Sequence, residues 1–325
     1  MRNKGEGIKR FLYERNSLVV LVIFILLGML LYGKFFTVLN LTNIMRQASF
    51  NGIIAIGMTI VILTGGIDLS VGSMFAMSGV LISYLQNQSL IVILIVPIVA
   101  GLFMGLLNGL SVAKLKIAPF ITTLATMMAF RGIVFLLTDG GITRPIKNEA
   151  FEAIGRGDVF GFIPMPALIF IILTLVFMFV MQYTRYGRRI YAFGGNCEAA
   201  RMMGVNVNSI EISAYVLSGM LAACSGIIMA SRMGSGEPVA GRGYEMEAIA
   251  ATVLGGTSLL GGVGKISGTF CGTLILAIIN NLINMQGNVE ARVQNVIMGI
   301  ILLVVVIIQS RINFTGRRTQ TCPQK

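Results

Sequence analysis

Asp68 is the only charged residue in the otherwise apolar stretch 47–113. A charge at the centre of a bilayer costs about 3 kcal/mol on insertion scales, so such an acid either ends a helix or takes part in transport. Residues 47–87 have the length of about two membrane spans, which favours a turn at the cytoplasmic membrane edge. There Gly65 or Gly66 would end one helix and Asp68 would cap the next. A gate residue in a transport path is the alternative.

A second glycine-interrupted segment resembles the one around Asp68. Each segment is an apolar run followed by a glycine pair, polar residues, a leucine and another glycine. Paired interruptions in the two halves of a transporter indicate an internal repeat around a central site. The sequence therefore predicts an inverted internal repeat, with structural turns at Gly65, Gly66, Gly255 and Gly256; convergent turn chemistry without a repeat is the alternative.

The connector 184–208 carries the signals of a short, well-capped helix. Asn196 is a good N-cap, Glu198 lies in the first turn and forms an opposite-charge i,i+3 pair with Arg201, and Gly204 suits a left-handed C-cap. Isolated helices this short are marginal in water, so we expect this one to dock against another protein. A basic connector with a single helical turn is the alternative. The residues expected to form the docking helix are Asn196, Glu198, Ala199, Ala200, Arg201 and Gly204.

The elements that carry these residues belong to a membrane protein. The 325 residues are 55% hydrophobic and only 12% charged, whereas soluble domains are about 25% charged. The net charge of +12 comes from basic residues in short connectors between apolar runs, which is typical of cytoplasmic loops and argues against nucleic-acid binding.

We predict an all-α polytopic protein with about ten transmembrane helices and both termini in the cytoplasm. Most of the 25 basic residues fall on the cytoplasmic side in this arrangement, as the positive-inside rule requires. The eighth span is short and rich in glycine, so a re-entrant segment is the alternative there. The expected spans are 17–33, 47–66, 70–87, 90–112, 118–137, 163–183, 209–230, 246–261, 266–284 and 293–310.

The predicted domain organisation is a single transmembrane permease domain, 17–310, with cytoplasmic segments before and after it. Those segments are 1–16 and 311–325. Two polar loops on the outside, 138–163 and 232–245, are long enough to receive a soluble partner; plain solvated connectors are the alternative.

Several kinds of chemistry are excluded by composition. The chain has no histidine, so it cannot form a Ser–His triad or a histidine metal site. Its four cysteines show no CxxC spacing, and we expect no metal and no disulfide framework. The nearest approach to a P-loop has Ile266 after Lys265, where a Ser or Thr must reach Mg²⁺. The chain is therefore not expected to be an enzyme, nor to bind ATP or another cofactor itself.

The chain resembles the permease subunits of bacterial ABC importers. The docking-helix motif is similar to their coupling loop, and the stretches 55–73 and 247–258 are similar to the ribose-type sugar branch of a superfamily that also contains branched-chain amino acid permeases. The resemblance runs from about residue 40 to 310. It implies a type II importer permease fold in the bacterial inner membrane.

The resemblance also implies partners. These are a second permease copy in a homodimer, a cytoplasmic ABC ATPase that receives the docking helix, and an external sugar-binding protein; membrane lipid surrounds the assembly and no nucleic acid is involved. A branched-chain amino acid permease and an ion-coupled secondary transporter are the alternative functions. An ion-coupled transporter usually buries several ionisable groups along its path, whereas 47–113 holds only Asp68.

A sugar path needs polar side chains that can bind hydroxyl groups. Intramembrane asparagines could do so, or could instead join helices by hydrogen bonds. The candidates for the path or a gate are Asp68, Asn51, Asn108, Asn280, Asn281 and Asn284.

Overall fold

The computed structural model describes residues 16–159 and 161–286, together with residues 296, 299, 300 and 303. The described residues form twelve helices and four two-residue strands. Six helices are long and apolar enough to cross a membrane. These are α3 (Val38–Leu63), α5 (Leu90–Ala113), α6 (Pro119–Leu137), α8 (Met165–Tyr183), α11 (Val207–Met233) and α13 (Ile266–Met285).

The remaining helices are shorter. They are α2 (Asn16–Leu31), α4 (Val71–Leu85), α7 (Glu149–Arg156), α9 (Arg185–Gly195), α10 (Cys197–Met202) and α12 (Tyr244–Leu254). Of these six helices, α2 and α4 are apolar.

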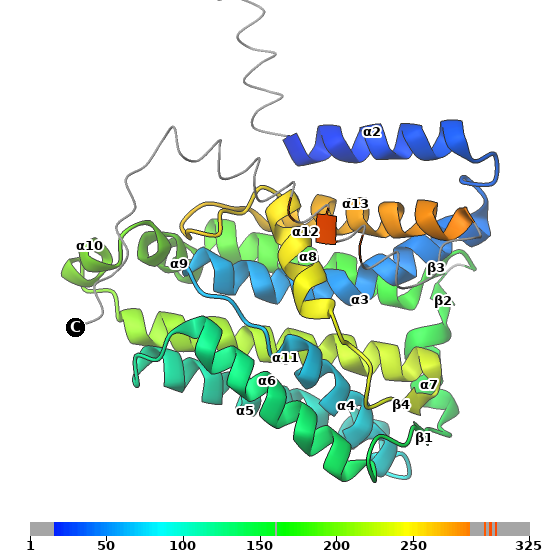
Figure 1. Cartoon of the computed structure of the whole chain (residues 1–325), viewed down its shortest axis with the longest axis horizontal. Helices are drawn as coiled ribbons and strands as arrows, with labels where there is room; N and C mark the ends of the chain where they lie inside the picture. Colours follow the sequence, from blue (N-terminus) through cyan, green and yellow to red (C-terminus); the bar gives the residue numbers. More distant parts are fainter. Residues whose placement is uncertain (1–15, 160, 287–295, 297–298, 301–302, 304–325) are drawn as a thin grey trace, which may run out of the picture.

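The long helices lie side by side, and successive helices alternate in direction once the shorter α2, α4 and α12 are counted with them (Figure 1). One end of the bundle carries α9 and α10, and the opposite end carries α7 and the strands. The helix α12, in yellow, crosses the bundle steeply instead of running parallel to its neighbours. Two chain segments, 64–70 and 255–265, connect α3 to α4 and α12 to α13 without helical structure.

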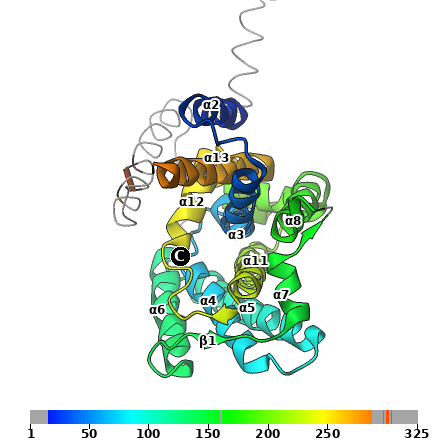
Figure 2. The same ribbon diagram turned by 90° about the vertical axis from the view of Figure 1, so that its right-hand side faces the viewer.

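The helix α11 lies near the centre of the bundle, with α3, α4, α5 and α8 around it (Figure 2). Glycines on α5 allow a close approach: a Cβ added at Gly105 would lie 2.9 Å from the Cα of Val216, and one at Gly109 would lie 2.8 Å from the Cα of Ile212. Small residues allow helices to pack closely in lipid, where no hydrophobic force joins them. The glycine spacing on α5 therefore serves helix packing.

The two polar loops predicted to lie outside, 138–163 and 232–245, are joined to each other. Strand β1 (Arg144–Pro145) pairs with β4 (Ser235–Gly236), and β2 (Asp158–Val159) pairs with β3 (Ile163–Pro164). The amphipathic α7 packs on α11, where the Ser231 hydroxyl accepts the Gly155 N–H at 2.7 Å. The end of the bundle opposite α9 and α10 thus carries a structured cap built from these two loops.

The predicted spans agree with the observed helices in most of the chain. Eight of the first nine coincide with an apolar helix, the eighth span being the exception, while the tenth, 293–310, lies largely outside the described residues. The eighth was predicted as 246–261, but α12 ends at Leu254 and the chain continues without helical structure. The second span begins earlier than predicted, because α3 extends through the polar residues that follow Val38.

Candidate functional site: two broken segments and a docking helix

The helix α3 ends in the turn predicted for it. Gly65 adopts a left-handed conformation with φ +82°, and its N–H bonds to the Ile62 carbonyl at 2.8 Å. The next N–H, of Gly66, reaches back to the Val61 carbonyl at 3.1 Å. These two bonds form a Schellman motif, which satisfies carbonyls that a helix end otherwise leaves without partners.

The side chain of Asp68 is completely buried and is held by α5, α11 and the residue before α4. It accepts bonds from the Ser70 hydroxyl at 2.6 Å, the Ser218 hydroxyl of α11 at 2.8 Å and the Asn108 amide of α5 at 3.5 Å. The Asn108 amide also donates to the Ser70 hydroxyl at 2.8 Å. The cluster thus joins α5, α11 and the start of α4 in the interior, where a polar group without partners is costly.

The structure corrects the prediction for Asp68 in one respect. Ser70, not Asp68, is the residue that precedes α4; Asp68 caps the turn before it by accepting the Ser70 N–H at 3.1 Å. Its place at the membrane edge stays a prediction; its partner Ser218 lies about three turns inside α11. The segment 64–70 turns back into the bundle, so the acid lies in the protein interior.

The helix α12 ends in the same way as α3. Gly256 has φ +88° and donates to the Val253 carbonyl at 2.9 Å, and the Thr257 N–H bonds to the Thr252 carbonyl at 3.0 Å. The predicted turn at Gly255 and Gly256 is thus present, and it is again a Schellman motif.

The two segments without helical structure, 64–70 and 255–265, are called the broken segments below. They meet at the end of the bundle that carries α9. The Gly262 N–H donates to the Leu63 carbonyl at 2.9 Å, which joins the segment 255–265 to the end of α3. The Tyr191 hydroxyl of α9 donates to the Gly264 carbonyl at 2.8 Å. Burial raises the pKa of Tyr191 above its ordinary value, so its phenol remains a hydrogen-bond donor at neutral pH.

The helix α10 has the caps that the sequence predicts. The Asn196 side chain accepts the Ala199 N–H at 3.0 Å. Gly204 has φ +79°, and bonds from the Gly204 and Val205 N–H groups, each at 3.0 Å, close the last turn on Arg201 and Ala200. A third Schellman motif therefore ends this helix.

Other features of the docking helix differ from prediction. No ion pair joins Glu198 to Arg201 among the residues that the structure describes. The residues before Asn196 form the amphipathic helix α9, whereas the sequence predicts a connector there. Met202 and Met203 are 90% and 70% exposed. Neither was among the residues predicted to form the docking surface.

The predicted path asparagines have different surroundings. The amide of Asn51 donates to the Glu247 carboxylate, and its own Oδ1 atom is buried without a partner. Asn281 exchanges two bonds with Asn40, at 2.7 and 3.1 Å, and so joins α13 to α3. Asn280 is buried on α13, one turn before Asn284. Glu247 was not predicted, although an acid in an apolar run could have been noticed.

A second charged side chain, that of Arg131 on α6, joins this helix to the segment after β4. The Arg131 guanidinium donates to the carbonyls of Pro238, Ala240 and Gly72 at 2.7, 2.8 and 2.9 Å. The Glu245 carboxylate lies close by, so that the positive charge has a nearby counterpart. Arg131 thus fixes the segment after β4 against the start of α4.

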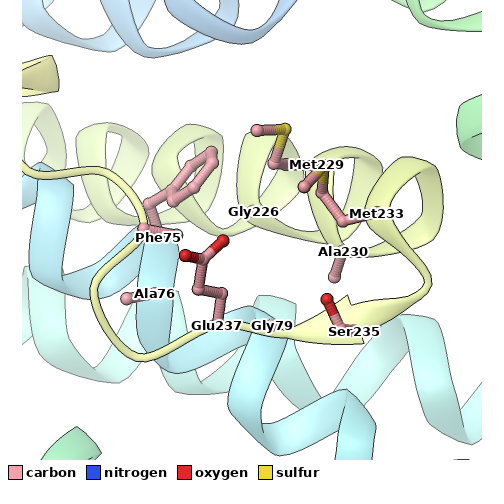
Figure 3. A pocket seen from close by; sticks show the side chains of 10 residues that line it. Phe75, Ala76, Gly79, Gly226, Met229, Ala230, Met233, Ser235 and Glu237 are labelled. Carbon is pink, nitrogen blue, oxygen red and sulfur yellow. The ribbon is translucent and has the colours of Figure 1, made fainter. Parts of the chain in front are cut away.

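A pocket opens between α4, α11 and the segment after β4. Figure 3 shows Phe75, Glu237 and Met229 lining it. The space between these side chains is partly open to solvent, whereas small-molecule sites bury most of the surface of their ligand. We therefore assign no substrate to this pocket. No cluster of His, Cys, Asp or Glu suited to a metal ion occurs among the described residues.

Six apolar spans, a buried charge tied to several helices and an exposed helix at one end define a multi-pass membrane transport protein. The chain matches the family described as "Branched-chain amino acid transport system / permease component" over residues 40–306, and it belongs to that family. It is therefore a transport subunit and not an enzyme. The predicted recognition as an importer permease is confirmed.

Among curated relatives, several are ribose permeases. The chain is 44% identical to the ribose import permease protein RbsC of Haemophilus influenzae over 286 residues, 85% of this chain and 87% of the relative. It is 42% identical to RbsC of Bacillus subtilis over 274 residues, covering 83% and 84%. The xylose transport system permease protein XylH of Escherichia coli is 34% identical over 308 residues, covering 75% and 78%. No solved structure matches the chain.

Proposed function

We propose that this chain forms the translocation path of an ATP-driven importer for a ribose-type monosaccharide. The observation that carries the proposal is α10, a short helix capped at both ends that projects from the bundle (Figure 1). Its exposed Met202 and Met203 give it an apolar surface outside the bundle. Exposed apolar patches mark protein–protein contacts. The likeness to ribose permeases supports the sugar class over branched-chain amino acids.

The proposed assembly has three kinds of subunit. A cytoplasmic ATPase receives α10 through Asn196, Glu198 and the residues up to Gly204. An external binding protein docks on the outer loops 138–163 and 232–245, and their pairing through β1 and β4 gives it a firm surface. A second copy of the chain completes a homodimer. ATP is bound by the ATPase, and the permease itself carries no cofactor.

The proposed topology keeps both termini in the cytoplasm. It places 17–310 in one permease domain of about ten spans, with 293–310 as the last span and 1–16 and 311–325 as flanking segments. The alternating direction of the helices supports it, because α9 and α10 then share one side with the start of α2 (Figure 1). The segments after α3 and α12 meet at the same end of the bundle, where the Gly262 N–H bonds to the Leu63 carbonyl, so this pair of segments does not support the predicted inverted repeat.

For the sugar path, we propose Asn51 as the residue best suited to bind hydroxyl groups. It is half-buried, faces the Glu247 carboxylate and has an oxygen free of protein partners. Carboxylates and amides can both bond to sugar hydroxyls. Asn280 and Asn284 on the neighbouring α13 are further candidates. Asp68 and Asn108 are better suited to hold the bundle together than to contact a solute, because both are completely buried.

The test is to purify the permease together with the ATPase and the binding protein of its importer. ATPase activity in proteoliposomes should rise with ribose-loaded binding protein and less with xylose. Stimulation by a branched-chain amino acid in place of a sugar would contradict the proposal.

Two variants of α10 test the docking helix. Glu198→Lys reverses the charge in the first turn, and Gly204→Val strains a left-handed residue by about 1–2 kcal/mol. We expect both to reduce uptake by about tenfold or more while the protein still inserts into the membrane. Gly195→Ala is the matched control, because a Cβ there meets no atom within 4 Å. Wild-type uptake by both variants would rule out this role for α10.

A further inference from the structure

The contact between α9 and the two broken segments contains no side chain at its centre. A Cβ added at Gly194 would collide with the Leu63 carbonyl oxygen and lie 2.5 Å from the Gly262 nitrogen. Gly262 in turn has φ +71°, and a Cβ there would lie 2.8 Å from the Gly194 carbonyl carbon. Three backbones that are far apart in the sequence therefore touch directly.

Hydrogen bonds fix this junction in place. The Leu63 carbonyl belongs to the last turn of α3, where carbonyls lack partners within the helix; it accepts the Gly262 N–H at 2.9 Å. One turn before Gly194, the Tyr191 hydroxyl donates to the Gly264 carbonyl at 2.8 Å. The segment 255–265 is thus attached both to α9 and to the end of α3, from which the segment 64–70 continues, and α9 leads through Asn196 directly into α10.

We propose that Gly194 and Tyr191 transmit movement from α10 to both broken membrane segments at once. The inference rests on the proposed function, since it requires an ATPase that moves α10. Closely packed backbone transmits displacement because packed interiors have low compressibility. A side chain between the three backbones would separate them, which explains why glycine occupies position 194. Gly194 and Tyr191 are positioning residues: they contact no substrate and act through the segments 64–70 and 255–265.

The helix α9 offers a matched control for each residue. Gly195 follows Gly194, but a Cβ at Gly195 meets no atom within 4 Å. Tyr186 is a second half-buried tyrosine whose hydroxyl bonds to Ser213 of α11 at 3.0 Å and not to either broken segment. Burial raises the pKa of Tyr186 as it does that of Tyr191, so the two phenols are alike in charge state.

The experiment measures ribose transported per ATP hydrolysed, in proteoliposomes that contain the complete importer. We expect Gly194→Ala and Tyr191→Phe to lower this ratio by about fivefold or more, the equivalent of one lost hydrogen bond. Gly195→Ala and Tyr186→Phe should stay within about twofold of wild type. A general folding defect would lower uptake and ATP hydrolysis together and leave the ratio unchanged.

Two results would overturn the inference. One is a wild-type ratio for both Gly194→Ala and Tyr191→Phe; the other is an equal fall in the ratio for the test variants and their controls. If Gly194→Ala does not fold, Tyr191→Phe decides, since it removes a single oxygen atom. A wild-type importer that shows no ribose-dependent ATP hydrolysis would instead refute the proposed function, and this inference with it.

Discussion

Helices α3 and α12 are both followed by a left-handed glycine. In each case the N–H of that glycine and the N–H of the next residue bond back to the last turn of the helix. After that the segments differ. Three residues beyond Gly65 stands the buried acid Asp68, whereas three residues beyond Gly256 stands Leu259. The acid ties the segment 64–70 to α5 and α11 through side chains.

The segment 255–265 is held mainly by backbone. The Ser258 N–H donates to the Val263 carbonyl at 2.8 Å, and the Gly261 N–H donates to the Ser258 carbonyl at 3.0 Å. Its other attachments lead to α9 and to Leu63. The comparison indicates that the first segment is anchored in the core of the bundle, while the second is attached to the side from which movement would come.

The largest expected effect comes from removing the anchor. Asp68→Ala leaves the donors of Ser70, Asn108 and Ser218 without their common acceptor in the interior, and we expect a loss of about 3 kcal/mol or more in unfolding free energy. Leu259→Ala should cost less than half as much, because Leu259 is only partly buried. Unfolding of the purified proteins in detergent measures both. Equal losses would show that the two segments are anchored alike.

A smaller effect is expected at the glycines that the segments share. Gly65→Ala and Gly256→Ala should each cost about 1–2 kcal/mol, because an L-residue is strained at positive φ. The two losses should be equal, since an added Cβ comes no closer than 3.8 Å to another atom at Gly65 and meets none within 4 Å at Gly256. Unfolding measurements with Gly195→Ala as the control test this. A loss of unfolding free energy in only one of the two variants would show that the two helix ends are not equivalent.

The smallest effect concerns the helices beside the two segments. The hydroxyls of Thr59 on α3 and Thr269 on α13 lie 2.6 Å apart and are buried. A double-mutant cycle with Thr59→Val and Thr269→Val should give a coupling energy of about 0.6 kcal/mol, the average for such bonds in membrane proteins. Additive losses would show that these helices are not coupled through this bond.

Local signals were predictable from the sequence. The conformations of Gly65, Gly256 and Gly204 follow from glycine at a helix end, and the Asn196 cap follows from the side-chain chemistry. What the sequence could not show is where separate segments meet. The depth of Asp68 depends on Ser218, 150 positions away in the chain.

The helix α9 was missed for a related reason. Gly187, Gly194 and Gly195 lower its helix propensity, yet Gly187 and Gly194 are required by close contacts with α8 and with the broken segments. Tertiary packing therefore decided the structure where local propensity argued against it.

The central claim is that ATP, used by a partner subunit, drives a sugar through this permease. It is tested most directly by ribose uptake into proteoliposomes that hold the complete importer, ATP and ribose-loaded binding protein, after proton and sodium gradients have been dissipated. We predict that uptake continues under these conditions and stops when ATP is omitted. Uptake that persists without ATP, or that disappears with the ion gradients, would contradict the claim.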